Sequence, residues 1–176
     1  MPPFFQLIRD ICLLRRGPQD VPYSVPLLVG VAAACVGIQL AFAIARNLPI
    51  GGTLAGAALK LMASLGALNL ILNLRGLRNR FVQAATALLG CAFVFMLLSV
   101  PIVLLVGEPP TGAEQVTPLR VLLGLGSLVL LLWKIVVDAH VFRHSFDVPF
   151  LSGLVVALLW IVGTFVLAAA AGSPAV

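Results

Sequence analysis

Long apolar stretches alternate with short polar ones along most of this sequence, and the alternation predicts its helices. The apolar stretches cover residues 25–45, 53–74, 81–106, 119–141 and 148–171, and three of them contain no charged residue. Each is at least as long as the roughly 20 residues that a helix needs to cross a hydrocarbon core. The pattern therefore predicts five transmembrane helices, which together make residues 23–176 the membrane domain.

The N-terminal segment has a different pattern, because its apolar and polar residues fall on opposite sides of a helix. Over residues 3–16 the apolar positions recur as in an amphipathic helix that lies in a membrane interface, and Gly17-Pro18 ends it. Arg9 and Asp10 interrupt the apolar part, so we expect the segment to stay on the mature protein rather than act as a cleaved signal peptide. Residues 1–22 are thus predicted to form an interfacial segment, and docking onto a partner is the alternative.

Three of the predicted helices share a start signal, in which proline follows a capping residue. The signals are Ser24-Val25-Pro26, Thr117-Pro118 and Asp147-Val148-Pro149. Proline is tolerated in the first turn because its missing N–H would have no partner there. We expect the first residue of each signal to cap the helix that follows.

Composition excludes a water-soluble domain. Hydrophobic residues make up 61% of the 176 residues and charged residues 10%, against roughly half and one quarter in soluble domains. The net charge of +5 lies in short clusters beside apolar stretches, which favours contact with anionic lipid headgroups and not with nucleic acid. We therefore expect an all-α, polytopic helical bundle in a membrane.

Arginines are distributed unevenly between the two ends of this predicted bundle. Seven fall on the side of the N-terminus and two on the other: Arg9, Arg15, Arg16, Arg75, Arg78, Arg80 and Arg143 against Arg46 and Arg120. The positive-inside rule then predicts a cytoplasmic N-terminus and a periplasmic C-terminus. The alanine-, glycine- and leucine-rich composition is typical of a bacterial inner (plasma) membrane protein.

Three ionisable residues are expected within or near the apolar layer. Lys60 lies well inside the second predicted helix, where it either extends to the nearer surface or points inward to a carbonyl, Gln39 or a lipid phosphate. Lys134 and Asp138 are four residues apart, so they share a helix face and are predicted to pair. Intramembrane ionisable residues are also the usual candidates for a transport path.

Both histidines of the chain, His140 and His144, lie near the predicted end of the fourth span. If that helix continues through Arg143, the two rings share a face and, with Asp147, have the residue types of a metal site; a haem ligand is a further use. Solvated interface residues are the simpler interpretation, and we expect neither metal nor cofactor.

Sequence patterns of common enzyme classes are missing. The chain has no HxxxxD of membrane acyltransferases, no GxSxG elbow, no P-loop and no HExxH helix. Its cysteines, Cys12, Cys35 and Cys91, form no CxxC pair and are interpreted as small apolar residues. With only six acidic residues and two histidines available, we expect no catalysis.

Several features of the layout occur together. They are five closely spaced spans, an amphipathic lead-in, proline near the end of the third span in LLSVPIVLLV, a leucine-rich fourth span that runs through Trp133 into a short turn, and an alanine-rich fifth span. In this layout the chain resembles the bacterial branch of the Yip (Rab-interacting) family of five-span membrane proteins. The resemblance implies a protein that acts through protein and lipid contacts, without catalysis or cofactor.

Two functions follow as hypotheses. The first is an inner-membrane interaction, assembly or accessory protein that binds other membrane proteins or itself, as well as anionic lipids. Its contacts would be the exposed basic residues, and the Lys134–Asp138 pair would hold the inner helix ends together; the basic residues are Arg75, Arg78, Arg80 and Arg143. The alternative is a small transporter or channel component whose path is lined by Lys60, Lys134 and Asp138, although five spans cannot form two equal halves.

Overall fold

The computed structural model describes residues 4–106 and 117–170, and within these ranges the chain forms helices and no strands. Five of the helices are long and apolar enough to cross a membrane, which confirms the predicted all-α fold with five spans and identifies a multi-pass membrane protein. The elements are α1 (Phe4–Cys12), η1 (Pro18–Asp20), α2 (Val25–Ala45), α3 (Ile50–Leu74), η2 (Arg78–Arg80), α4 (Phe81–Val106), α5 (Pro118–Phe146) and α6 (Phe150–Ala170).

The largest difference from the predicted boundaries is in α5. This helix runs to Phe146 instead of ending at residue 141, so Arg143 and His144 are helical. Helix α3 begins at Ile50 rather than at residue 53, and α1 ends at Cys12 rather than at residue 16. The other predicted helix ends lie within two residues of those observed.

Two of the three predicted caps are confirmed. Ser24 Oγ accepts a hydrogen bond from the Leu27 N–H at 3.3 Å, and Thr117 Oγ1 accepts one from the Arg120 N–H at 3.4 Å. The third is wrong, because Asp147 terminates α5 in the left-handed conformation (φ 54°, ψ 51°) and α6 begins only at Phe150. The longer α5 places this aspartate at a helix C-terminus, where a short polar side chain tolerates positive φ.

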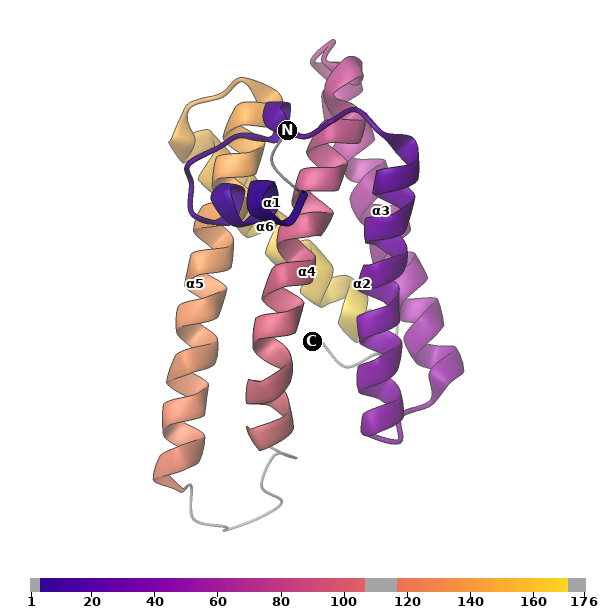
Figure 1. Cartoon of the computed structure of the whole chain (residues 1–176), viewed down its shortest axis with the longest axis vertical. Helices are drawn as coiled ribbons and strands as arrows, with labels where there is room; N and C mark the ends of the chain where they lie inside the picture. The colour runs from indigo at the N-terminus through magenta and orange to yellow at the C-terminus, as the bar shows by residue number, and fades with distance from the viewer. Residues whose placement is uncertain (1–3, 107–116, 171–176) are drawn as a thin grey trace.

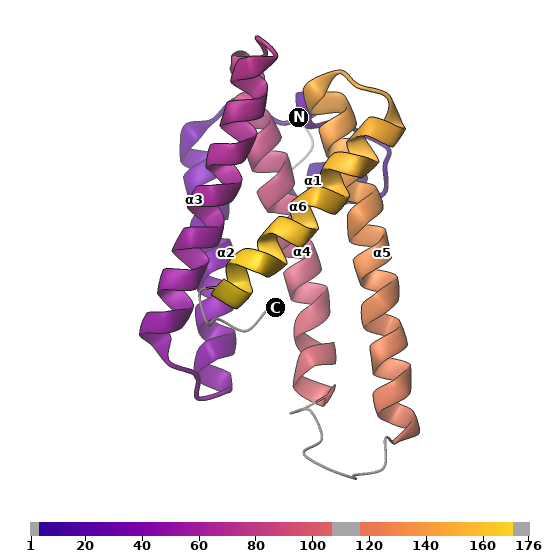
Figure 2. The ribbon, with the colours of Figure 1, turned by 180° about the vertical axis from the view of Figure 1, so that it is seen from behind.

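The five long helices are arranged with α4 between α2 and α5, and with α3 beside α2 (Figure 1). Figure 2 shows that α6 runs obliquely across the back of the bundle, from the α5–α6 turn toward α2 and α3. The turns α3–α4 and α5–α6 lie at the same end of the bundle as α1 and η1 (Figures 1 and 2). This end is called the α1 end below.

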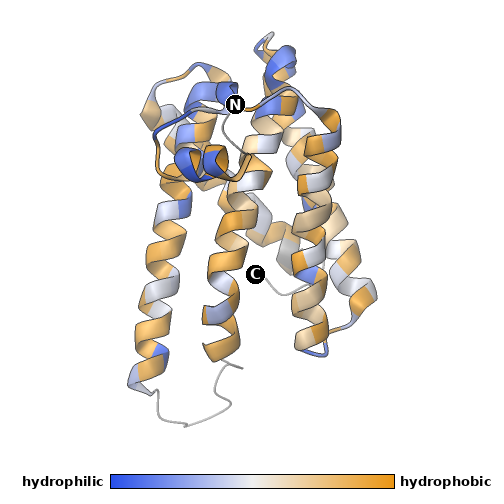
Figure 3. Cartoon of the chain, in the orientation of Figure 1, coloured by the Kyte–Doolittle hydropathy of each residue, from blue (hydrophilic) through white to orange (hydrophobic). Residues whose placement is uncertain are grey.

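The tightly packed core lies toward the α1 end. Buried residues of α4 fall within Val82–Phe95, and those of α5 fall within Val137–Phe146. Away from this end the leucines of α5 are exposed, as Leu122 is at 66%. Such residues face the hydrocarbon of a membrane, which favours an apolar surface. Figure 3 shows the complementary pattern, since hydrophilic residues gather at the α1 end.

Helix α1 is amphipathic, as predicted, and its apolar side packs against the chain's own α4 and α5. Leu7, Ile8 and Ile11 are all buried. Helix α4 has a glycine at the contact: a Cβ at Gly90 would lie 2.6 Å from Ile8 Cδ1. The missing side chain of Gly90 thus makes room for α1.

Candidate functional site

Hydrogen bonds fasten the N-terminal segment across the α1 end of the bundle. Trp133 Nε1 donates to the Cys12 carbonyl at 3.1 Å, and His140 Nε2 lies 3.0 Å from the Arg16 carbonyl oxygen. Further along, Gln83 Nε2 donates to the Val21 carbonyl at 2.8 Å. These contacts join α4 and α5 to residues more than 60 positions away in the sequence, so the segment is held from the end of α1 to its junction with α2.

The predicted pair of Lys134 and Asp138 forms on α5. Lys134 Nζ bonds to Asp138 Oδ2, and Asp138 is fully buried while the lysine side chain is 28% exposed. Asp138 Oδ1 is buried and makes no hydrogen bond within the described residues. Because a buried charge is strongly unfavourable without a partner, Lys134 compensates for Asp138 in the packed part of the bundle.

Lys60 lies in the middle of α3, away from both helix ends, and is partly buried. Across residues 4–106 and 117–170 it has no hydrogen-bond or ion-pair partner. Gln39, one of the inward partners considered from the sequence, donates instead to the Cys35 carbonyl at 3.3 Å. Lys60 therefore does not join Lys134 and Asp138 in one cluster.

The two histidines share a face of α5, because the helix continues through Arg143. Their ring centroids are 4.5 Å apart in an edge-to-face arrangement. The third residue of the proposed metal site, Asp147, directs its carboxylate to Arg80 Nη1 at 3.3 Å. No group of three potential metal ligands is found in the part of the chain that the structure describes.

The four basic residues predicted as contacts have two different roles. Arg75 Nη1 donates to the Phe146 carbonyl at 2.8 Å, and Arg80 Nη1 donates to the His144 carbonyl at 3.3 Å. Both arginines thereby occupy carbonyls that the C-terminus of α5 leaves without intrahelical partners. Arg78 and Arg143 are exposed, and neither has a partner among the described residues.

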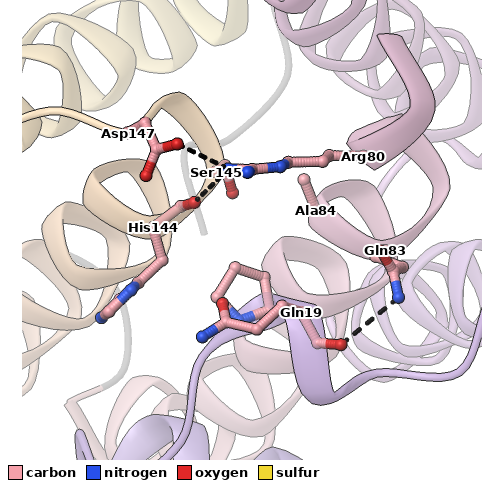
Figure 4. Close-up of a pocket in the computed structure, with 8 residues that line it drawn as sticks. Gln19, Arg80, Gln83, Ala84, His144, Ser145 and Asp147 are labelled. Carbon is pink, nitrogen blue, oxygen red and sulfur yellow. Dashed lines mark hydrogen bonds and ion pairs between the residues drawn. The ribbon is translucent and has the colours of Figure 1, made fainter. Parts of the chain in front are cut away.

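A cavity of about 300 Å³ opens at the α1 end, between η1, the start of α4 and the end of α5 (Figure 4). Its polar lining includes Gln19, Arg80, Gln83, His144 and Asp147. From the sequence, Arg80 was predicted to belong to a separate feature from His144 and Asp147, and no cavity was predicted. Its residues come from three distant segments, and the only local signal is that each segment is polar beside an apolar helix.

The three cysteines are buried and free. A hydrogen bond from the Cys91 thiol, where α1 crosses α4, lowers the pKa of the Cys12 thiol below its ordinary value. Cys35 Sγ donates to the Leu89 carbonyl at 3.5 Å, so it joins α2 to α4. The structure thus places all three in helix contacts.

Comparisons of the chain with protein-family models, with curated proteins and with solved structures find no match. The resemblance in layout to the Yip family stays a prediction.

Proposed function

We propose that this protein acts through protein and lipid contacts made by its α1 end, as an interaction, assembly or accessory protein of a bacterial inner membrane. Its partner is another membrane protein or a second copy of the chain, and no catalytic step is part of the proposal. The excess of arginine at the α1 end supports a cytoplasmic N-terminus and a periplasmic C-terminus. The five-span layout behind an amphipathic helix supports a Yip-like protein.

The observation that carries this proposal is the outer surface of the N-terminal segment. The segment is bonded to the core, yet large aromatic side chains point outward on it and directly after it: Phe5 is 76% exposed and Tyr23 is 66% exposed. Exposed Arg78 and Arg143 lie at the same end of the bundle. Aromatic residues and arginine are enriched in protein interfaces, and aromatic residues also anchor proteins at the membrane–water boundary.

The test is the native mass of the protein after gentle extraction from its own membranes, with identification of whatever remains bound. We expect a complex larger than one chain, which is weakened when Arg78 and Arg143 are both changed to glutamine. Arg120→Gln is the control, because it removes a positive charge at the opposite end. A monomer that carries only lipid, or equal loss of the complex in the control, would contradict the proposal.

Transport is the second candidate, and the position of Lys60 favours it. A lysine in the middle of a membrane helix without a protein partner is the kind of residue that binds a transported anion. Lys134 and Asp138 fit this function less well, because the buried carboxylate is already paired. Anion flux in vesicles that contain the wild-type or the Lys60→Met protein distinguishes transport from assembly. A transporter loses anion flux on this substitution and keeps its native mass. An assembly protein shows no anion flux in either form.

A further inference from the structure

The cavity at the α1 end holds donor groups that the protein leaves unused. Within the described residues, Arg80 makes its polar contacts through Nη1 alone, so Nε and Nη2 keep their hydrogens available. The Gln19 amide nitrogen and the His144 ring also make no hydrogen bond there. A neutral imidazole still carries one N–H donor. Three segments of the chain thus each contribute a donor to one cavity (Figure 4).

The Gln19 side chain lies directly over the backbone of Gly17. A Cβ at residue 17 would lie 2.4 Å from Gln19 Oε1, so this side-chain position requires Gly17. On the opposite wall, Gln83 Nε2 donates to the carbonyls of Gln19 and Val21 at 3.3 and 2.8 Å. The wall formed by η1 is therefore hydrogen-bonded to α4, so the segment that carries Gln19 has a defined position beside the cavity.

Arg80 already binds an anionic oxygen, that of the Asp147 carboxylate at 3.3 Å. The Asp147 side chain is 72% exposed and the Arg80 side chain 42% exposed, and an exposed ion pair of this kind contributes only about 0 to 1 kcal/mol. An incoming anion displaces the carboxylate at little cost. A phosphate group also offers the two oxygens that a guanidinium binds side by side.

We propose that this cavity binds the phosphate group of a small anion, with Arg80 as the main contact and with Gln19 and His144 lining the space around it. Its volume of about 300 Å³ lies at the lower end of the range for small-ligand sites. The phosphate comes either from an anionic lipid headgroup or from a soluble phosphate compound. For the lipid source, the assignment rests on the proposed function, which brings the α1 end to anionic lipid.

The experiment titrates the detergent-solubilised full chain with short-chain phosphatidylglycerol and, separately, with inorganic phosphate, and counts bound molecules by native mass spectrometry. Arg80→Gln should weaken binding about tenfold or more, since it removes a charged hydrogen bond. Asp147→Asn should tighten binding, because it removes the competing carboxylate and asparagine tolerates the left-handed backbone. Arg15→Gln is the control, since it removes an exposed arginine at the same end of the bundle that does not line the cavity.

Opposite effects of Arg80→Gln and Asp147→Asn on phosphate binding, with the Arg15→Gln control unchanged, would support the site. Binding of phosphatidylglycerol alone identifies the lipid source, and binding of inorganic phosphate identifies a soluble one. Equal weakening by Arg80→Gln and Arg15→Gln would mean that binding depends on diffuse surface charge and would overturn the assignment, as would the absence of binding of both probes. If the Arg80→Gln protein does not fold, the Asp147→Asn protein decides: a gain in phosphate affinity would support the site, and no gain would overturn it.

The native mass of the Asp147→Asn and Arg80→Gln proteins separates this site from the proposed function. Loss of phosphate binding with an intact complex would leave the assembly role standing without the cavity. A bound phosphate on a chain that has no partner would reject the assembly role and keep the site.

Discussion

Replacing Gly153 with alanine would place a methyl group between the backbones of two helices. Gly153 lies in the first turn of α6, where that helix packs against α5. The new Cβ would lie 2.6 Å from the Ala139 carbonyl oxygen and 3.1 Å from the Arg143 nitrogen. Backbone atoms cannot rotate away as side chains do, so α5 and α6 must move apart.

The size of the effect follows from two opposing contributions. An extra methyl group in a well-packed contact costs about 1 to 3 kcal/mol, and the higher helix propensity of alanine returns up to about 1 kcal/mol. Separation of the helices also loosens Ala157, which is fully buried one turn further along α6. We expect Gly153→Ala to lower the free energy of unfolding by about 1 to 2 kcal/mol.

Unfolding by sodium dodecyl sulfate in mixed micelles, followed by tryptophan fluorescence, measures this change. Trp160 of α6 reports on the contact, because its ring lies edge-on to Phe142 of α5 with centroids 5.2 Å apart. Gly163→Ala is the matched control in the same helix, since its new Cβ would meet nothing within 4 Å. Equal stability of the two variants would refute the close crossing of α5 and α6.

Three further changes test the α1 end. Trp133→Phe removes the hydrogen bond to the end of α1, so trypsin should cleave after α1 several-fold faster than in the wild type; an unchanged rate would contradict this anchoring role. Gly90→Ala should also release α1, and adding Ile8→Ala should restore protection by making room for the new methyl group, as the same cleavage assay would show. Asp138→Asn should lower the free energy of unfolding by roughly 3 kcal/mol, because it leaves Lys134 without a counter-charge. Replacing both residues with apolar ones should change it little, and unfolding in sodium dodecyl sulfate measures both variants.

The membrane helices could be predicted from the sequence because their length and apolar content are local properties. The end of α5 and the start of α6 could not be predicted, since residues 140–149 include the polar residues of a turn. In the structure, Phe142 and Phe146 are buried in the core and extend α5 through this stretch. A helix that ends five residues later moves Asp147 from the start of one helix to the end of another.

The cavity was beyond sequence analysis for a related reason. Gln19 and Arg80 are separated in the sequence by two long helices, α2 and α3, and no periodic pattern connects them. Arg75 and Arg80 were predicted as surface contacts because arginine beside a membrane helix usually faces water. Their hydrogen bonds to the end of α5 depend on where that helix stops, which the sequence did not reveal.

Packing and charge are concentrated at the same end of this molecule, and the coincidence has a physical cause. Lipid covers exposed leucines such as Leu122 at no cost, so helices within the hydrocarbon can remain loosely packed. Helix ends and turns at the α1 end must instead satisfy their free carbonyls, and Arg75 and Arg80 do so. Those bonds hold α5 against the α3–α4 turn, and with the N-terminal segment they fix the surface that carries Arg78 and Arg143. A partner or an anion that binds as proposed would therefore meet a preformed surface there, which would reduce the entropy lost on binding.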